Sequence, residues 1–190
     1  MKHIILCRHG ETEWSRDHKH TSFTDLSLTE KGMAQAKKLQ KPLKNLSFDE
    51  VYTSPLKRAR QTCALADPAV EVLEEPLATE WNYGDYEGIT TKEIRKTDPK
   101  WNLFFDGAPG GEGPDDVAKR ADKLIAKWLK MDKNILLFSH GHFLRVLGAR
   151  WIGLPPKDAR LFGLSVASIS ILGFEREQRV LSSWSIPNKE

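Results

Sequence analysis

Residues 3–14 read HIILCRHGETEW, and this stretch decides the fold prediction. A short apolar run, 3–7, passes directly into Arg8 and His9. An apolar run of this length that ends in a polar loop is typical of a buried strand. A histidine at the end of such a strand is either a satisfied core residue or a reactive one, and the rest of the sequence has to decide between them.

The composition is that of a globular domain. The chain has 190 residues, of which 39% are hydrophobic and 29% are charged, and its formal net charge is +3. This length is enough for a substantial core, so we expect residues 1–190 to form a single domain. The mildly basic charge does not by itself indicate nucleic acid, because a local anion site would fit it equally well.

The cysteines and the N-terminus bear on the compartment. Cys7 and Cys63 are the only cysteines, too few for a disulfide framework, and no CxxC pair suggests structural zinc. A reducing compartment is the simple inference. The N-terminal apolar run is shorter than a signal peptide requires, and no stretch approaches the ~20 apolar residues of a membrane helix. We therefore expect a cytoplasmic protein without a membrane partner.

Strands and helices alternate along most of the chain. The expected strands are 3–7, 49–54, 70–75 and 134–139, and the expected helices are 29–46, 55–66, 115–130 and 143–153. Thr29 is a suitable N-cap, and Pro42 should kink or end its helix. Two final alternating runs, 167–175 and 179–185, suggest a hairpin. This order predicts an α/β fold, a three-layer α/β/α sandwich with a mostly parallel central sheet and an antiparallel edge.

Residues 79–116 interrupt the alternation. The segment ends in the glycine-rich run DGAPGGEGPDD, 106–116, and contains Thr90 and Glu93 at the spacing of a capping box, so a short helix is expected inside it. Long insertions in compact domains are usually functional. We therefore expect a lid-like insertion near a site.

Chemically active side chains follow the expected strands. In largely parallel sheets, sites form at the carboxyl ends of the strands. The residues that could reach that edge are Arg8, His9, Arg58, Glu80 and His140. Two guanidiniums can orient a phosphate dianion, and a neutral imidazole can form a covalent phospho-enzyme. A second histidine, if protonated, can donate to a phosphoryl oxygen, and a protonated carboxyl can give its proton to the leaving alcohol.

Each of these residues also has a structural alternative. A lone histidine at a strand end is more often structural, and exposed arginines commonly form ion pairs. His140 and His142 in SHGH could suggest a metal, but they are two residues apart and no carboxylate pair flanks them, so neither a metal site nor a cofactor is expected. Phosphoryl transfer asks mostly for positioning and charge stabilisation, which this set could supply without a metal. The joint placement after successive strands favours the functional interpretation.

The segment RHGETEW, 8–14, resembles the signature of the histidine phosphatase superfamily, also called the phosphoglycerate mutase-like family. Four more blocks resemble that family in its own order: TDLSLTEKG (24–32), YTSPLKRARQT (52–62), TEWNYGDYEG (79–88) and LLFSHGHFLRVL (136–147). The first block alone is moderately specific, whereas all five in order are highly specific. The resemblance implies a phosphoglycerate mutase-like sandwich.

The resemblance also implies roles for matching positions. His9 would be the phosphorylated nucleophile and Glu80 the proton donor, and both would act with Arg8, Arg58 and His140. The implied substrate contacts are Arg8, Ser15, Thr21, Ser22, Arg58, Tyr83 and His140. The loop at Thr21 and Ser22 closes over the phosphate in related enzymes. Ser15 stands where many members have a phosphate-contacting asparagine, and His142 stands where several relatives carry asparagine.

The insertion favours the phosphatase branch over the mutases. Mutases of this family have a longer insertion with paired arginines that grip a substrate carboxylate, whereas here the stretch has Trp101, Phe104 and Phe105 and no paired arginine. These aromatic residues either pack the lid or contact substrate. We expect a metal-independent phosphomonoesterase of the acid phosphatase type, which hydrolyses a small phosphate ester, with sugar phosphates among the candidates, through a phosphohistidine.

Three alternatives stay open at this stage. One is a cofactor-dependent phosphoglycerate mutase, and another is a phospho-ligand binding module that has lost catalysis. A third is nucleic-acid binding through the lysines at 37, 38, 41 and 44, but these are more typical of the solvated face of a helix, so no nucleic-acid partner is expected. The C-terminal hairpin could offer an edge for a homodimer.

Overall fold

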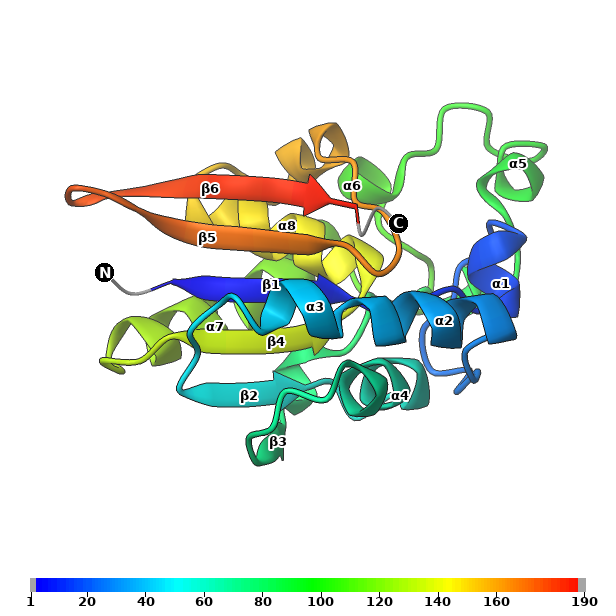
Figure 1. Ribbon diagram of the computed structural model, residues 1–190. Coiled ribbons are helices and arrows are strands. Elements are labelled where there is room, and N and C mark those ends of the chain that lie inside the picture. The colour runs from blue at the N-terminus through cyan, green and yellow to red at the C-terminus, as the bar shows by residue number, and fades with distance from the viewer. Residues whose placement is uncertain (1–2, 188–190) are drawn as a thin grey trace.

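The computed structural model describes residues 3–187. Its centre is a six-stranded sheet in the order β3-β2-β4-β1-β5-β6 (Figure 1). The strands are β1 (Ile4–Arg8), β2 (Glu50–Thr53), β3 (Val72–Glu74), β4 (Ile135–Ser139), β5 (Ile169–Glu175) and β6 (Gln178–Ile186). The pairs β1–β4, β2–β4 and β2–β3 are parallel, and β5 runs antiparallel to both β1 and β6. The expected sheet with an antiparallel edge, formed by the C-terminal hairpin, is confirmed.

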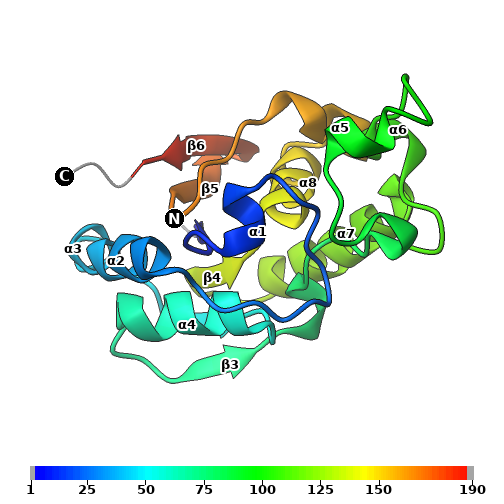
Figure 2. The same cartoon turned by 90° about the vertical axis from the view of Figure 1, so that its right-hand side faces the viewer.

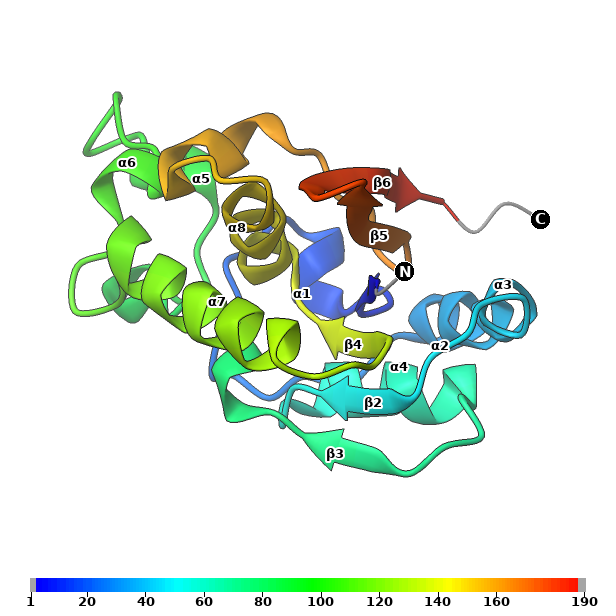
Figure 3. The same cartoon turned by 90° about the vertical axis from the view of Figure 1, so that its left-hand side faces the viewer.

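Helices cover both faces of this sheet. The helices are α1 (Glu13–Arg16), α2 (Glu30–Lys38), α3 (Gln40–Leu43), α4 (Lys57–Ala66), α5 (Thr91–Ile94), α6 (Leu103–Asp106), α7 (Pro114–Leu129) and α8 (Gly141–Trp151), with 3₁₀ turns η1 (Pro76–Ala78), η2 (Gly84–Tyr86) and η3 (Pro156–Leu161). Figure 2 and Figure 3 place α2, α3 and α4 together on one side and α7 and α8 on the other. The three expected layers are therefore present.

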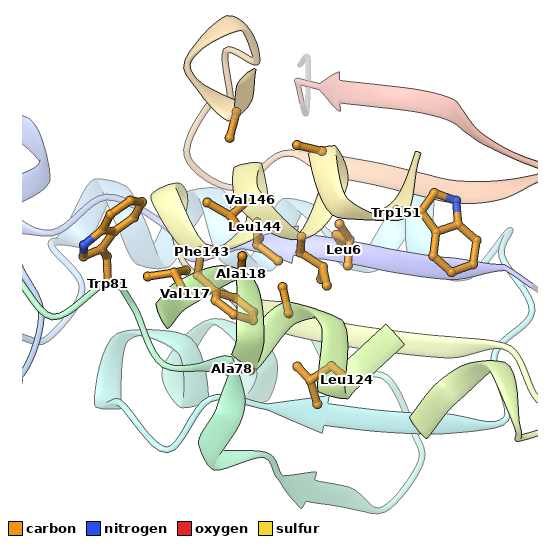
Figure 4. Packing of buried hydrophobic residues seen from close by; sticks show 14 of the residues in the cluster. Leu6, Ala78, Trp81, Val117, Ala118, Leu124, Phe143, Leu144, Val146 and Trp151 are labelled. Atoms are coloured by element: carbon orange, nitrogen blue, oxygen red, sulfur yellow. The ribbon is translucent and has the colours of Figure 1, made fainter. Parts of the chain in front are cut away.

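The central strand β1 is buried on both faces, as the apolar run predicts. Ile4 and Leu6 belong to the core under α7 and α8, whereas Ile5 and Cys7 belong to the core under α2, α3 and α4. This division follows from the alternation of side chains along a strand. Figure 4 shows Leu6 between the sheet and the two helices, in the same layer as residues of α7 and α8. Both layers of core therefore fix the position where β1 ends.

Several helix boundaries differ from the prediction by one or two residues or more, and two of these differences have identifiable reasons. The helix that begins after Thr29 is interrupted at Leu39, three residues before Pro42. Proline lacks an N–H and its ring crowds the carbonyl four residues earlier, so the break falls upstream of it. Helix α8 begins at Gly141, two residues before the expected start, because β4 passes into it through the single residue His140.

Local signals in the sequence are otherwise confirmed. The Thr29 side chain accepts a hydrogen bond from the Gly32 N–H, and Thr90 and Glu93 form the expected capping box at the start of α5. The predicted strand 70–75 is shorter in the structure, where β3 is an exposed edge strand of three residues. Within residues 3–187, every helix is too short or too polar to cross a bilayer.

The insertion lies beyond the carboxyl ends of the parallel strands, near α1 (Figure 1). Trp81, Trp101 and Phe104 are buried in the same core as α7 and α8, whereas Phe105 is 53% exposed. The Trp101 indole N–H donates to the Gly107 carbonyl oxygen at 3.0 Å. The insertion is thus anchored to the main body by aromatic packing, which favours the packing interpretation for Trp101 and Phe104.

Candidate active site

Three parallel strands bring the expected site residues together. The backbone N–H of His9 donates to the Ser139 carbonyl oxygen at 3.0 Å, and the N–H of Ser54 donates to the Phe138 carbonyl oxygen at 2.9 Å. These bonds continue the strand pairing just past β1 and β2. As a result, the rings of His9 and His140 lie side by side, with their centroids 5.3 Å apart.

His9 is held as a neutral imidazole. Its Nδ1 lies 2.7 Å from the Gly10 carbonyl oxygen, so Nδ1–H donates there and Nε2 keeps its lone pair. Burial lowers the pKa of His9 well below its ordinary value, and the charges of Arg58 and Arg8 lower the pKa further. A Cβ at Gly10 would collide with the Gly32 carbonyl oxygen, which explains the glycine after this histidine.

Arg8 presents an unused donor. Its Nη1 donates to the Leu164 carbonyl oxygen, and its guanidinium packs against Gly141. Its Nε is buried and has no hydrogen-bond partner among the residues the structure describes. Buried guanidinium donors are almost always paired in proteins, so this orphan favours an anionic ligand.

Arg58 is completely buried beneath the loop that follows α1. Its Nη2 donates to the carbonyl oxygens of Thr21 and Ser22, each at 3.1 Å, and its Nε donates to Nδ1 of His140 at 3.1 Å. Arg58 therefore joins the second histidine to the loop that is expected to close over phosphate.

The environment of His140 opposes the protonated state considered from the sequence. With Nδ1 accepting from Arg58, the Nε2–H donates to Ser54 Oγ at 2.7 Å. Burial lowers the pKa of His140 well below its ordinary value, and the charge of Arg58 lowers it further. His140 is thus neutral here. A phosphate contact from this ring requires that it exchange one of its two partners.

Glu80 lies at the N-terminus of α8. Its Oε1 accepts from the backbone N–H groups of Trp81 at 2.9 Å and Phe143 at 2.8 Å, and its Oε2 accepts from the N–H of His142 at 3.1 Å. The positive end of a helix dipole favours a carboxylate at this position. These bonds hold Glu80, which belongs to the insertion, at the edge of the sheet where His9 lies.

Tyr83 and His142 form a second pair above the site. The Tyr83 hydroxyl lies 2.6 Å from Nδ1 of His142. Burial raises the pKa of Tyr83 and lowers that of His142, so the hydroxyl donates to the neutral ring. His20 packs edge-on against Tyr83, with ring centroids 4.8 Å apart.

The loop at residues 21–24 is tied to the insertion. The Glu87 carboxylate accepts from the backbone N–H of Ser22 at 2.8 Å and from the N–H of Thr24 at 3.1 Å. Ser15 is less available than expected, because its hydroxyl donates to the Thr12 carbonyl oxygen at 3.0 Å within the capping box of α1.

These groups surround a cavity of about 270 Å³. The expected residues that line it are Arg8, His9, Ser15, Thr21, Glu80 and Tyr83. Arg58, Ser22 and His140 do not line it; they are buried and contact lining residues or their chain neighbours instead. The sequence reasoning did not assign a site role to Lys19, His20, Thr91, His142 and Arg145, which also line the cavity. Arg145 lay inside a family-like block, but no pattern singled it out. In the part of the chain that the structure describes, no three His, Cys, Asp or Glu side chains cluster as metal ligands would.

The site and the fold together define a class of protein. Residues 4–187 match the profile of the Histidine phosphatase superfamily (branch 1), and the chain belongs to this superfamily. It is a phosphatase of that superfamily, as its similarity to characterised relatives indicates.

Two relatives and one solved structure illustrate the similarity. The acid phosphatase of Mycobacterium tuberculosis is 40% identical over 183 residues, which cover 94% of this chain and 90% of that protein. The sedoheptulose 1,7-bisphosphatase of Saccharomyces cerevisiae is 34% identical over 182 residues, covering 79% of this chain and 67% of that protein. A solved structure of an open reading frame product from M. tuberculosis has a TM-score of 0.95 and 38% identity, with 99% of each chain covered.

Proposed function

We propose that this chain is a metal-independent phosphomonoesterase that hydrolyses a small phosphate ester through a phosphohistidine at His9. The observation that carries the proposal is the neutral imidazole of His9 beside the buried guanidinium of Arg58 and the half-buried Arg8, whose Nε is buried. Arg8 offers to the phosphate dianion an Nε that has no partner within residues 3–187. Arg58 adds a second positive charge from below.

The proposed reaction has two steps. In the first, the lone pair of His9 Nε2 attacks phosphorus, the bond from phosphorus to the ester oxygen breaks, and Glu80 gives its proton to that oxygen. The three backbone N–H groups that already hold the Glu80 side chain stabilise the resulting carboxylate. In the second, Glu80 takes a proton from water, the water oxygen bonds to phosphorus, and the N–P bond breaks to release phosphate and neutral His9.

The size of the cavity supports a small substrate. A volume of about 270 Å³ lies just below the usual range of ligand pockets, which begins at about 300 Å³. A relative named as a sugar bisphosphatase keeps sugar phosphates among the candidate substrates.

Phosphate release from a panel of esters tests this proposal. Sugar phosphates, nucleotides and phosphoglycerates would be incubated in EDTA with the protein and with His9→Ala as control. We expect release that is insensitive to EDTA and absent from the variant. Normal turnover by a folded His9→Ala protein would remove the proposed nucleophile.

The same panel separates the alternatives. A phosphoglycerate mutase would exchange 2- and 3-phosphoglycerate with little net release, and a silent binding module would bind esters saturably without hydrolysis. The cytoplasmic location and a homodimer along the edge strand β6 stay predictions, to be checked by fractionation and by light scattering.

A further inference from the structure

Arg120 of α7 directs its whole guanidinium at the segment that carries Glu80. Its Nη1 donates to the carbonyl oxygens of Leu77 at 2.6 Å and Thr79 at 3.1 Å, and its Nη2 donates to the Glu80 carbonyl oxygen at 3.3 Å. Its Nε and Nη2 also donate to the two oxygens of the Glu112 carboxylate, at 2.7 Å and 2.9 Å. The five N–H groups of the guanidinium are therefore all engaged, three of them by the backbone that leads up to Glu80.

Glu112 secures the same segment on the other side of Glu80. Its Oε2 accepts from the backbone N–H of Asn82 at 2.8 Å, and its backbone carbonyl oxygen accepts from the Trp81 indole N–H at 2.8 Å. The Glu112 N–H donates in turn to the Asn82 carbonyl oxygen at 2.9 Å. One arginine–carboxylate pair thus holds the chain both before and after the proposed proton donor.

The glycine-rich run of the insertion makes this contact possible. Gly111 lies so close to Asn82 that a Cβ built on it would stand 2.2 Å from the Asn82 carbonyl oxygen. Only glycine permits such a close approach of two backbones. The approach brings the next residue, Glu112, against the segment that carries Glu80.

The same guanidinium lies on the residue that binds the Glu80 carboxyl. Cζ of Arg120 is 4.9 Å from the centroid of the Phe143 ring, a distance at which a cation is attracted to an aromatic face. The backbone N–H of Phe143 donates to Glu80 Oε1 at 2.8 Å. Arg120 therefore contacts both the backbone that carries the Glu80 side chain and the helix turn that binds its oxygens.

The Arg120–Glu112 pair is set back from the reacting groups. The described residues that line the catalytic cavity include neither Arg120 nor Glu112. Their side chains are 16% and 20% exposed, so solvent screens the ion pair only in part. A bidentate arginine–carboxylate pair is the strong form of this interaction and fixes geometry as well as charge. Such a pair is suited to hold a backbone, and through it Glu80, rather than to contact substrate.

We infer that Arg120, held in place by Glu112, is a positioning residue for the proton donor. It fixes the backbone at Glu80 so that the carboxyl stays at the edge of the sheet where His9 lies. Displacing a catalytic group by about 1 Å can lower the rate by about 10²-fold, so this support matters for the acid step. The inference rests on the proposed function, in which Glu80 gives its proton to the leaving oxygen.

Two substrates that differ in their need for an acid test the inference. Glycerol 3-phosphate expels an alkoxide, which needs the proton from Glu80, whereas 4-nitrophenyl phosphate expels a stable phenolate. The ratio of their kcat/KM values reports the acid step and does not depend on the fraction of active protein. Arg120→Lys keeps the charge and loses the fork of donors. We expect its kcat/KM to fall by about tenfold or more for glycerol 3-phosphate and by less than about threefold for 4-nitrophenyl phosphate.

Arg150→Lys is the matched control. Arg150 also forms a bidentate pair with a residue of α7, Asp122, at 2.9 Å and 3.0 Å, and its other hydrogen bond goes to the Leu154 carbonyl oxygen. None of these partners belongs to the segment at Glu80, so this variant should leave the ratio unchanged. Thermal denaturation would compare the stabilities of the two variants.

Glu112→Gln is a second probe that leaves the arginine in place. Its neutral amide weakens the pair with Arg120, so the ratio should fall in the same direction as in Arg120→Lys. This variant keeps the inference testable if Arg120→Lys does not fold.

A double variant separates the positioning of Glu80 from general support of the fold. In Glu80→Gln the acid is absent, so adding Arg120→Lys should not lower the ratio further. A residue that only stabilised the fold would reduce activity on both substrates equally and leave the ratio unchanged in either background.

The outcomes are distinguishable. An unchanged ratio in Arg120→Lys and Glu112→Gln, an equal fall in Arg150→Lys, or a further fall in the double variant would each overturn the positioning role. If Glu80→Gln alone still lowered the ratio in those cases, the proposed function would stand without it. A ratio unaffected by Glu80→Gln, or the absence of His9-dependent release from any ester, would contradict the proposed function itself, and the inference with it.

Discussion

Burial and the positive charges of Arg58 and Arg8 both lower the pKa of His9. Both disfavour the imidazolium, and the hydrogen bond from Nδ1 to the Gly10 carbonyl oxygen fixes the tautomer. An imidazole in this state is a competent nucleophile across neutral pH. The same two arginines that keep the ring neutral are suited to attract the phosphate it attacks. One arrangement of charge therefore serves both requirements of the proposed reaction.

Substrates with different leaving groups can show whether Glu80 donates a proton or only positions other residues. A poor leaving group such as an alkoxide needs the proton from Glu80, whereas a nitrophenolate does not. In Glu80→Gln, kcat for alkyl phosphates should fall by about 10²–10⁴-fold, while 4-nitrophenyl phosphate should lose much less. Steady-state kinetics on both substrates would check this. An equal loss on both would show that Glu80 positions α8 rather than donating a proton.

At the scale of elements, the start of α8 is the clearest case of structure that the sequence does not predict. Gly141 and His142 read as loop residues, yet they form the first turn of the helix. That turn is capped by Glu80, which is more than sixty residues away in the chain. A cap supplied from such a distance leaves no local pattern. By contrast, the caps at Thr29 and Thr90 come from the same segment and were predictable.

The loop at residues 21–24 depends on one carboxylate from another element. Because Glu87 accepts from the N–H groups of Ser22 and Thr24, Glu87→Ala should loosen this loop over the cavity. We expect KM to rise by about tenfold and kcat to change less. Glu87→Gln is the control, since its amide oxygen can still accept from both N–H groups, as Oε1 does, and its KM should stay closer to that of wild type than the KM of Glu87→Ala does. An unchanged KM in a folded Glu87→Ala protein would contradict the role of this tie.

For the whole molecule, the sequence predicts the layers of the sandwich and the five residues at its open edge. It does not predict which of them face the cavity: Arg58 and His140 are buried beneath it. It also does not reveal a second cavity of about 190 Å³ beside the first, because Arg95, Arg145 and Arg160, which line it, come from separate elements without a shared motif. Strand order and apolar patterning are local properties, whereas these positions depend on how distant elements pack.

The buried histidines predict acid sensitivity of the fold. His9 and His140 have folded pKa values below those of the unfolded chain, chiefly because burial disfavours their charged forms. Below about pH 6.5 the unfolded state binds protons that the folded state does not, so stability falls as pH falls. The slope should reach roughly 1.4 kcal/mol per pH unit for each such histidine.

Urea denaturation between about pH 7.5 and about pH 5.5 would measure this slope before most carboxylates titrate. His9→Gln removes one of the protons, so its slope should be shallower. A free energy of unfolding that stayed constant or rose toward pH 5.5 would contradict the neutral, buried state of these rings.

The most direct test of the account is to trap the covalent intermediate. Protein treated with EDTA would be mixed with a phosphate ester that it hydrolyses. The reaction would be quenched rapidly in alkali, and the protein would be digested for mass spectrometry. We predict an acid-labile phosphate on His9 that forms and decays at rates consistent with turnover. If the phosphoryl-enzyme did not accumulate during steady-state turnover, the reaction would be repeated under single-turnover conditions and quenched at a series of times. Phosphate on another residue, or turnover with no phosphoryl-enzyme at any quench time, would contradict His9 as the nucleophile.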